Sequence, residues 1–421
     1  MQKTDDAARL AAEVIARCRH LSTFSEDSGS LRRTYLSPPM RIVHREIAGW
    51  LEPRGARVRI DAAGNLRALW PTDGEDQPRV LIGSHLDTVP NAGPYDGVLG
   101  VVLAVALIEA LRGQTLPYAI EIVGFSEEEG VRFGTPFIGS RALVGRLDDA
   151  LLALQDADGI SVRAAIETFG LDPAEIAQAT LRNNVCGYLE FHIEQGPVLE
   201  KLGRPLAVVE AIAGQSRLSI TFVGRANHAG TTPMDLRFDA VAGAAEWITL
   251  VERTAKVIPG LVATVGSVET KPGAVNVIAG EARLTLDVRH CDDEIRTRAV
   301  RDLMQQAEQI AQGRGLSVRY KTNLDQRAVF MDPTLSLEIE GAIRKAGCEP
   351  HRMVSGAGHD TMILAEKVPA GMVFLRTPGG ISHDPAESVL LEDVAKAIAC
   401  GFHLLEQLAS SPIFQTRTHR A

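Results

Sequence analysis

Cysteine is scarce in this sequence. Its 421 residues include five cysteines, and none belongs to a Cys-x-x-Cys pair. They stand far apart along the chain, at Cys18, Cys186, Cys291, Cys348 and Cys400. A small secreted protein stapled by disulfides has a denser and even-numbered set. The sequence therefore argues against a disulfide framework and favours a reducing compartment.

A surplus of basic residues and a long apolar run are also missing. The chain has 44 Lys+Arg against 53 Asp+Glu, a formal net charge of −9, which argues against nucleic acid or an anionic membrane as the main partner. Its most apolar window, 98–111, is shorter than the roughly 20 apolar residues that span a bilayer, and we expect a buried helix there. Residues 1–6 are polar and acidic, unlike a signal peptide. We expect a cytoplasmic location.

What is present indicates an α/β protein of more than one domain, since the length exceeds that of a single small core. Short β-type runs alternate with helical stretches, which is typical of a largely parallel sheet covered on both faces. We expect strands at 57–60, 66–70, 80–83, 119–125, 188–193 and 371–375, and helices at 4–21, 39–51, 98–111, 333–346 and 392–408.

The middle of the chain has a different pattern. Leu218, Ile220 and Phe222 alternate with polar residues, the period-2 pattern of a half-buried strand. Together with the elements expected at 240–251, 261–268, 282–288, 292–312 and 317–321, the order is β-α-β-β-α-β, a ferredoxin-like unit. We therefore expect a catalytic domain in two segments, 1–211 and 329–421, with an inserted α+β domain at 212–328.

Five potential metal ligands stand at or just after the ends of the expected large-domain strands: His85, Asp96, Glu129, His192 and His383. Taken singly, each has an ordinary explanation, such as a polar turn, a helix N-cap or a solvated acidic loop. Together they offer three imidazoles and two carboxylates, a set suited to Zn²⁺ or Mn²⁺. Five ligands exceed the need of one open catalytic ion, so two ions sharing Asp96 are the economical arrangement.

Asp87 lies two residues after His85. We expect its carboxylate to turn back onto the second ring nitrogen of His85, which would fix the tautomer and orientation of that ring.

Seven motifs in order carry a resemblance to a known family: Gly-Ser-His-Leu-Asp-Thr at 83–88, Tyr-Asp-Gly at 95–97, Glu-Glu-Gly-Val-Arg-Phe at 128–133, His-Ile-Glu-Gln-Gly-Pro at 192–197, Gly-Arg-Ala-Asn-His-Ala-Gly-Thr at 224–231, Ser-Gly-Ala-Gly-His-Asp at 355–360 and Ile-Ser-His-Asp-Pro-Ala-Glu at 381–387. The chain resembles the dinuclear metallohydrolases of the aminoacylase/carboxypeptidase type, and within them the hydantoinase/carbamoylase branch.

The resemblance implies a role for each ligand. It implies one divalent ion held by His85, Asp96 and His192, and a second held by Asp96, Glu129 and His383. Peptidases of the wider family usually have an acidic residue where His192 stands, so this histidine favours the amidase branch. The resemblance also implies that Glu128 is the general base, while we expect its neighbour Glu127 to be solvated. Mn²⁺ or Zn²⁺ is expected, and Co²⁺ or Ni²⁺ is compatible with such ligands.

Further roles fall on the inserted domain. The resemblance implies that His228 donates to the developing oxyanion, commonly from the partner subunit of a homodimer formed through this domain. It implies that Asn276 and Arg289 clamp a substrate carboxylate, together with Gln195 and the backbone near Gly358. The alternatives are a structural histidine and a surface arginine paired with Asp287 or Asp292.

The expected activity is hydrolysis of a ureido group, which releases ammonia and carbon dioxide. The segment Arg-Thr-Tyr-Leu-Ser-Pro at 33–38 resembles one in allantoate amidohydrolases, which favours allantoate as substrate, with N-carbamoyl-L-amino acids as the alternative. A peptidase or aminoacylase is the nearest enzymatic rival. A binding protein without activity is disfavoured, because all five ligands and Glu128 are retained.

Overall fold

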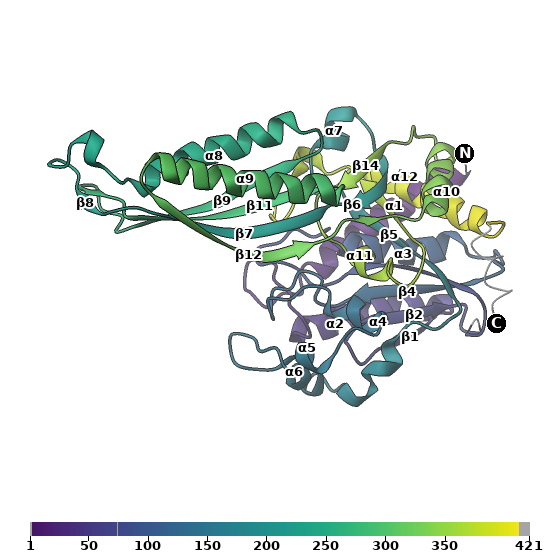
Figure 1. Cartoon of the computed structure of the whole chain (residues 1–421). Coiled ribbons are helices and arrows are strands. Elements are labelled where there is room, and N and C mark those ends of the chain that lie inside the picture. Colours follow the sequence, from purple (N-terminus) through teal and green to yellow (C-terminus); the bar gives the residue numbers. More distant parts are fainter. Residues whose placement is uncertain (1, 74, 412–421) are drawn as a thin grey trace. The chain divides into compact units, whose positions relative to one another are not determined.

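The computed structural model describes residues 2–73 and 75–411 and divides into two compact units. The larger unit comprises Met1–Glu210 and Met331–Ala421, and the smaller comprises Ala211–Phe330. Figure 1 shows the elements of each. Among the described residues, no helix has the length and apolarity that crossing a membrane requires.

A nine-stranded mixed sheet has the order β1-β2-β4-β3-β5-β15-β6-β13, with β14 also paired to β6. It belongs to the larger unit except for β13 and the last two residues of β6, which pair with each other within the smaller unit. Its central strands β4, β3, β5 and β15 are parallel, whereas β1, β2, β6 and β13 pair antiparallel. The predicted α/β class is thus confirmed, with parallel pairing at the centre of the sheet. The strands are β1 (Arg57–Ile60), β2 (Leu66–Trp70), β3 (Arg79–His85), β4 (Ala119–Phe125), β5 (Val185–Ile193), β6 (Leu206–Ile212), β13 (Val329–Phe330), β14 (Arg352–Ser355) and β15 (Ala370–Leu375).

Helices cover both faces of this sheet. On one face α3 packs against β3, β4 and β5, with α1, α10 and α12 around it, while α4 and α11 cover the other face. The helical segments are α1 (Gln2–Leu21), α2 (Pro38–Leu51), η1 (Glu52–Arg54), α3 (Val98–Ala110), α4 (Ile138–Leu143), α5 (Asp149–Leu152), α6 (Val162–Thr168), η2 (Pro173–Ala179), α7 (Val198–Leu202), α10 (Pro333–Lys345), α11 (Thr361–Leu364), η4 (Pro378–Gly380) and α12 (Leu391–Leu408).

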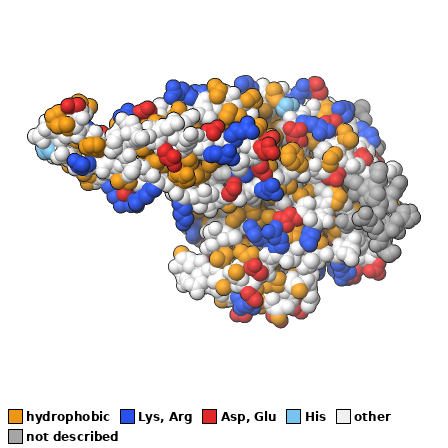
Figure 2. Space-filling view, in the orientation of Figure 1, with side chains coloured by type: hydrophobic (Ala, Val, Ile, Leu, Met, Phe, Trp, Pro, Cys, Tyr) orange, Lys and Arg blue, Asp and Glu red, His pale blue; other side chains and the backbone are white. Residues whose placement is uncertain are grey.

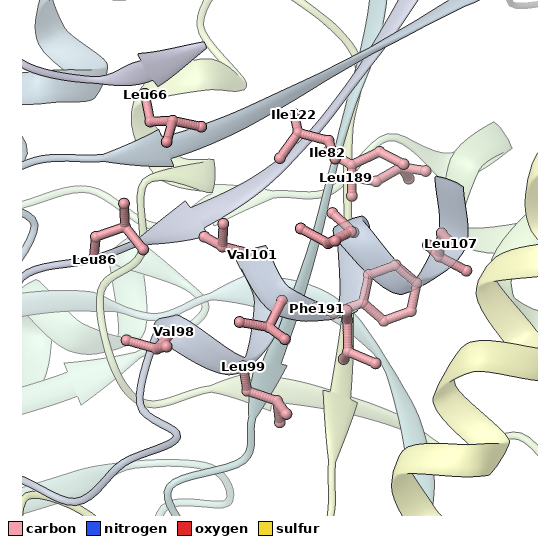
Figure 3. Close-up of a cluster of buried hydrophobic side chains, with 14 of the residues drawn as sticks. Leu66, Ile82, Leu86, Val98, Leu99, Val101, Leu107, Ile122, Leu189 and Phe191 are labelled. Carbon is pink, nitrogen blue, oxygen red and sulfur yellow. The ribbon is translucent and has the colours of Figure 1, made fainter. Parts of the chain in front are cut away.

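The core is centred on α3, which is the apolar segment expected at 98–111. Every residue from Val98 to Ile108 is buried, because the helix lies between the sheet and its neighbouring helices. Figure 3 shows side chains of α3 facing those of the sheet, among them Ile82, Leu189 and Phe191. Gly100 permits the closest approach: a Cβ there would lie 2.2 Å from the carbonyl oxygen of Phe191.

The smaller unit has a four-stranded antiparallel sheet in the order β12-β7-β11-β9. Helices α8 and α9 pack against it over a core that includes Phe222 and Trp247. The elements are β7 (Gly214–Val223), β8 (Asn227–His228), η3 (Met234–Leu236), α8 (Ala240–Val257), β9 (Val262–Lys271), β10 (Val277–Ile278), β11 (Glu281–His290), α9 (Asp293–Gly313) and β12 (Ser317–Gln326). Their order along the chain is β-α-β-β-α-β, apart from the short β8–β10 pair.

The approach of α3 to the sheet generates a stability prediction. Gly100→Ala forces a methyl group against the backbone of β5, so we expect the free energy of unfolding to fall by about 1–3 kcal/mol. The matched control is Gly49→Ala in α2, where nothing lies within 4 Å of the added Cβ. This control should be neutral or stabilise by up to about 1 kcal/mol. Urea denaturation measures both, and equal effects would contradict the close approach.

His44 in α2 is a buried ring with an unusual charge environment. Its exposed fraction is 5%, and neither ring nitrogen has a hydrogen-bond partner among the described residues. Burial, followed by the charges of Arg33 and Arg41, lowers the pKa of His44 to about 3. The folded protein therefore holds this ring neutral while the unfolded chain protonates it.

A pH dependence follows from this difference. Below a pH of about 6.5 the unfolded state binds one more proton at His44, so its contribution to the free energy of unfolding falls by about 1.4 kcal/mol per pH unit down to about pH 3. His44→Leu should remove this slope between about pH 6.5 and about pH 5, measured by urea denaturation. His20→Leu, at a half-exposed ring, is the control. Parallel curves for the unaltered and His44→Leu proteins would refute the prediction.

Candidate metal centre

The carboxyl ends of the parallel strands gather the predicted ligands. His85 is the last residue of β3, His192 is next to last in β5, and Glu129 follows β4. Asp96 precedes α3, and His383 lies in the loop after β15. Neighbouring parallel strands end at the same edge of the sheet, which is where α/β proteins bind ligands.

Three of these side chains meet around one oxygen of Asp96. His192 Nε2 lies 3.2 Å and His85 Nε2 3.7 Å from Asp96 Oδ1, and the two imidazole nitrogens are 3.4 Å apart. All three side chains are buried, and Asp96 Oδ1 accepts no hydrogen bond from the described residues.

The other oxygen of Asp96 faces the remaining two predicted ligands. His383 Nε2 lies 3.1 Å from Asp96 Oδ2 and 3.5 Å from Glu129 Oε1. Asp96 thus stands between two groups of donors, one on each oxygen.

The spacing of these atoms fits metal ligation. Donors that share a tetrahedral ion at about 2.1 Å must lie about 3.4 Å from one another. The donor separations of 3.2, 3.4 and 3.7 Å in the first group and of 3.1 and 3.5 Å in the second lie around this value. A buried carboxylate oxygen without a hydrogen bond is a further indication of a cation, since buried polar atoms are normally satisfied.

The loop before α3 has the shape that this cluster requires. Gly97 has a φ of 66°, and a Cβ there would lie 2.3 Å from the ring of His85. Only glycine provides both the left-handed backbone and the space for that imidazole.

Glu387, the last residue of the motif at 381–387, belongs to the site although no role was predicted for it. Its Oε1 accepts the backbone N–H groups of Tyr95 and Asp96, at 2.7 and 3.0 Å, and so fixes the backbone of the central carboxylate. Ser382 Oγ and Gln195 Nε2 also donate to Asp96 Oδ2, at 3.0 and 2.9 Å. In the sequence, the position of Glu387 four residues after His383 was the signal that could have indicated this role.

Asp87 differs from its expected role. His85 Nδ1 contacts the backbone carbonyl oxygen of Asp87 at 2.9 Å, whereas the carboxylate oxygen is 3.8 Å away. That carboxylate instead accepts the backbone N–H groups of Glu128 and Glu129, each at 3.0 Å. A short loop presents its own carbonyl to the ring, which leaves the charged side chain free to hold the neighbouring acidic loop.

The expectation that Glu127 is solvated is wrong. Its exposed fraction is 0% and its φ is 57°, so the side chain turns inward and accepts backbone N–H groups of Tyr35, Arg132 and Phe133. Burial, followed by the charge of Asp87, raises the pKa of Glu127 to about 8.

The pKa values of the remaining acidic side chains are also strongly shifted. Burial raises the pKa of Glu128 well above its usual value, and burial with the charge of Asp96 raises that of Glu129 to about 7. For Asp96, burial is outweighed by the neighbouring imidazoles of His383, His85 and His192, so its pKa lies well below the usual value. Such opposed shifts among neighbouring carboxyl groups mark functional sites.

The segment at 33–38 contacts the loop that follows His85. Arg33 is fully buried, donates from Nε to the carbonyl of Leu86 at 2.8 Å and from its backbone N–H to Thr88 Oγ1 at 3.0 Å. Tyr35 is also fully buried, and its hydroxyl donates to Ala63. Arg33 thus supports the loop that follows His85.

A buried polar layer lies behind the donor atoms of His85 and His192, and it was not predicted from the sequence. Glu190 is fully buried and accepts hydrogen bonds from Ser84 Oγ at 2.8 Å and from the hydroxyl of Tyr188 at 3.0 Å. The ring of His359 packs against that of His192 with centroids 4.5 Å apart. The signal in the sequence was that Ser84 directly precedes His85 in β3 and that Glu190 lies two residues before His192 in β5.

The other predicted residues lie elsewhere in the fold. Gly358 is in the loop between β14 and α11. In the smaller unit His228 is exposed in β8, and its Nδ1 accepts the N–H of Gly230 at 3.0 Å. Asn276 precedes β10, which pairs with β8. Arg289 donates to both carboxylate oxygens of Asp287, at 2.8 and 2.9 Å, which is one of the pairings considered as an alternative.

The fold and the site define a class of protein. Residues 81–407 match the model of Peptidase family M20/M25/M40, and the chain belongs to this family of metal-dependent hydrolases.

Individual relatives narrow the class. The allantoate deiminase of Arabidopsis thaliana is 40% identical over 96% of this chain and 83% of its own. The N-carbamoyl-L-amino acid amidohydrolase of Geobacillus stearothermophilus is 37% identical over 91% of this chain and 95% of its own. The crystal structure of a hydantoinase/carbamoylase family amidase from Burkholderia multivorans has a TM-score of 0.89 at 29% identity, over 96% of this chain and 98% of that one. The predicted resemblance to this branch is confirmed.

The support from Asp87 generates a prediction. Asp87→Asn replaces one of two accepting oxygens with an N–H donor, so the backbone of Glu128 or Glu129 loses its partner. We expect the affinity for Mn²⁺ or Zn²⁺ to fall about 10- to 100-fold, measured by competition with a chelator. Asp73→Asn at an exposed position is the control. Unchanged metal affinity in a folded Asp87→Asn variant would refute the supporting role.

Proposed function

We propose that this protein hydrolyses a ureido group of allantoate, forming an amine and a carbamate that breaks down to ammonia and carbon dioxide. The observation that carries the proposal is the placement of Asp96 between two groups of donors at ligand spacing. The relatives named allantoate deiminase, at 36–40% identity over nearly all of this chain, support the substrate.

We assign one divalent ion to His85, Asp96 and His192, and a second to Asp96, Glu129 and His383. Neutral imidazoles and carboxylates suit Mn²⁺ or Zn²⁺ and also accept Co²⁺ or Ni²⁺. Two such cations would polarise the ureido carbonyl and acidify a water between them.

Glu128 is the proposed general base. Its carboxyl lies beside the cluster, with a carboxylate oxygen within 4.8 Å of donor atoms of His85 and Glu129, and its backbone is held by Asp87. It takes a proton from the attacking water and returns it to the departing nitrogen when the C–N bond breaks.

Substrate recognition is assigned to both units. Arg289 and Asn276 would bind the substrate carboxylate, because a guanidinium pairs with it bidentately, with Gln195 and the backbone near Gly358 completing the contacts. Arg289 would then share its charge between the substrate and Asp287.

The smaller unit also has a proposed role in assembly. We assign it as a lid and as the dimerisation domain of a homodimer, in which His228 of each subunit serves the oxyanion of the other. His228 is exposed in β8, which pairs with β10. Its ring is therefore accessible for this role. We also propose a cytoplasmic location, with which five cysteines that form no disulfide agree.

The second candidate function is hydrolysis of N-carbamoyl-L-amino acids. It is favoured by relatives of that name at 33–37% identity. Both substrates present a ureido carbonyl and a carboxylate, so the same residues would serve either reaction.

A substitution at Glu128 tests the mechanism. Glu128→Gln keeps the shape of the side chain but cannot accept the proton, so we expect kcat to fall about 10²- to 10⁴-fold with metal content unchanged. Ammonia release from allantoate measures the effect, and Glu167→Gln at an exposed position is the control. An unaffected kcat would contradict the role of Glu128.

A substrate panel tests the proposed function. We expect the protein reconstituted with Mn²⁺ or Zn²⁺ to release ammonia from allantoate faster than from N-carbamoyl-L-amino acids, and removal of metal by a chelator to abolish both activities. The reverse order of rates would establish the second candidate. Cleavage of N-acyl amino acids or peptides without any ureido hydrolysis would overturn the proposal.

A further inference from the structure

A polar cavity lies in the larger unit, away from the five predicted metal ligands. It has a volume of about 700 Å³ and is lined by residues of β1 and β2, by the starts of β3 and β4, and by the segment around η2. The charged residues of its lining are Arg57, Arg59, Arg67, Arg79, Arg182, Glu75 and Glu121. Three of the strands that line it, β1, β2 and β4, are labelled in Figure 1.

The cavity is strongly basic in a chain of net charge −9. Its lining has five arginines against two glutamates, a surplus of three positive charges. On the face of the molecule in Figure 2, by contrast, basic and acidic side chains are interspersed. The surplus in the cavity is therefore a local feature.

The two glutamates are fully engaged by four of the arginines. Glu75 accepts from Arg57 at 2.8 Å and from Arg182 at 2.9 Å. Glu121 accepts from Arg67 at 2.6 Å and from Arg79 at 2.8 Å, and all three of these side chains are nearly buried. Asp61 adds a more distant contact to Arg67, at 3.6 Å.

Arg59 has no such partner. No carboxylate of the described residues forms an ion pair with it, and burial followed by the charge of Arg67 lowers the pKa of its guanidinium. Arg79 Nε, in a side chain that is 6% exposed, also lacks an acceptor in the described part of the chain. Arg59 itself is an exposed side chain, whereas Arg79 Nε is a buried donor, and buried donors without acceptors are uncommon in folded proteins. An anion in the cavity would accept from Arg79 Nε and pair with the charge of Arg59.

We propose that this cavity binds a small oxyanion with two or more negative charges, either a phosphate ester or a polycarboxylate. Guanidinium groups bind such anions bidentately. The volume falls within the range of small-molecule sites, roughly 300–1,000 Å³. The surplus of three charges matches a multiply charged ligand rather than a single carboxylate.

The cavity is separate from the proposed reaction site. Arg79 is the first residue of β3 and His85 is the last, and six residues of extended strand span roughly 20 Å. A ligand at Arg79 thus occupies the opposite end of the strand from the metal cluster, so it is a second ligand and not the ureido substrate.

A purely structural role accounts for part of the arrangement. Arg67 and Arg79 clamp Glu121 between neighbouring strands and would be needed for that alone. Arg59 contributes to no such clamp, which makes it the informative residue.

Calorimetric titration of the metal-loaded protein tests the proposal, with fructose 1,6-bisphosphate and tricarballylate as probes and potassium chloride at equal ionic strength as the blank. We expect saturable binding of at least one probe, and which of them binds distinguishes a phosphate ester from a polycarboxylate. Arg59→Gln should weaken that binding about tenfold, the worth of one charge-assisted contact. Ammonia release should stay unchanged.

Two further variants keep the result interpretable. Arg182→Gln, at a side chain that is 59% exposed, should also weaken binding and tolerates substitution if Arg59→Gln does not fold. Arg112→Gln removes the same charge at an exposed position outside the cavity and should bind as the unaltered protein does. No heat beyond the chloride blank, or equal affinity in all variants, would overturn the proposal without affecting the proposed hydrolysis.

Discussion

The candidate site depends on one buried carboxylate that serves two sides at once. Asp96 offers one oxygen to His85 and His192 and the other to His383. Burial would normally favour protonation of such a group, yet the surrounding imidazoles keep its pKa low. Glu387 holds its backbone and Gly97 gives the chain the necessary turn. If Asp96 moved, both groups of donors would lose their common member.

The acidic loop beside Asp96 is held in place by buried side chains that are not themselves predicted metal ligands. Asp87 and Glu127 each accept several backbone N–H groups, and Arg33 ties the loop after His85 to the segment before α2. Buried carboxyl groups of this kind are costly unless they are hydrogen-bonded. Here they fix the backbone of Glu128 and Glu129, so precision at the reacting groups is obtained from residues behind them.

The sequence was informative where local pattern decides structure. The apolar run of α3, the strands β3 and β4 and the five ligands at strand ends follow from periodicity and from the rule that strand ends gather functional residues. It failed where tertiary contacts decide. Leu206–Ile212, a short apolar run, was not assigned although it forms β6, because its pairing partners are remote in sequence. In the sequence, Glu127 has the pattern of a solvated acidic residue. Its positive φ, which turns the side chain inward, is set by the tertiary structure.

The larger unit is interrupted by the smaller one, and this has a consequence for synthesis. His383 and Glu387 lie beyond Phe330, whereas His85, Asp96 and Glu129 lie before Ala211. As the chain emerges from the ribosome, the smaller unit is complete before the last cluster members exist. A newborn chain therefore carries Asp96 without His383 and Glu387 until the segment beyond the smaller unit has been made.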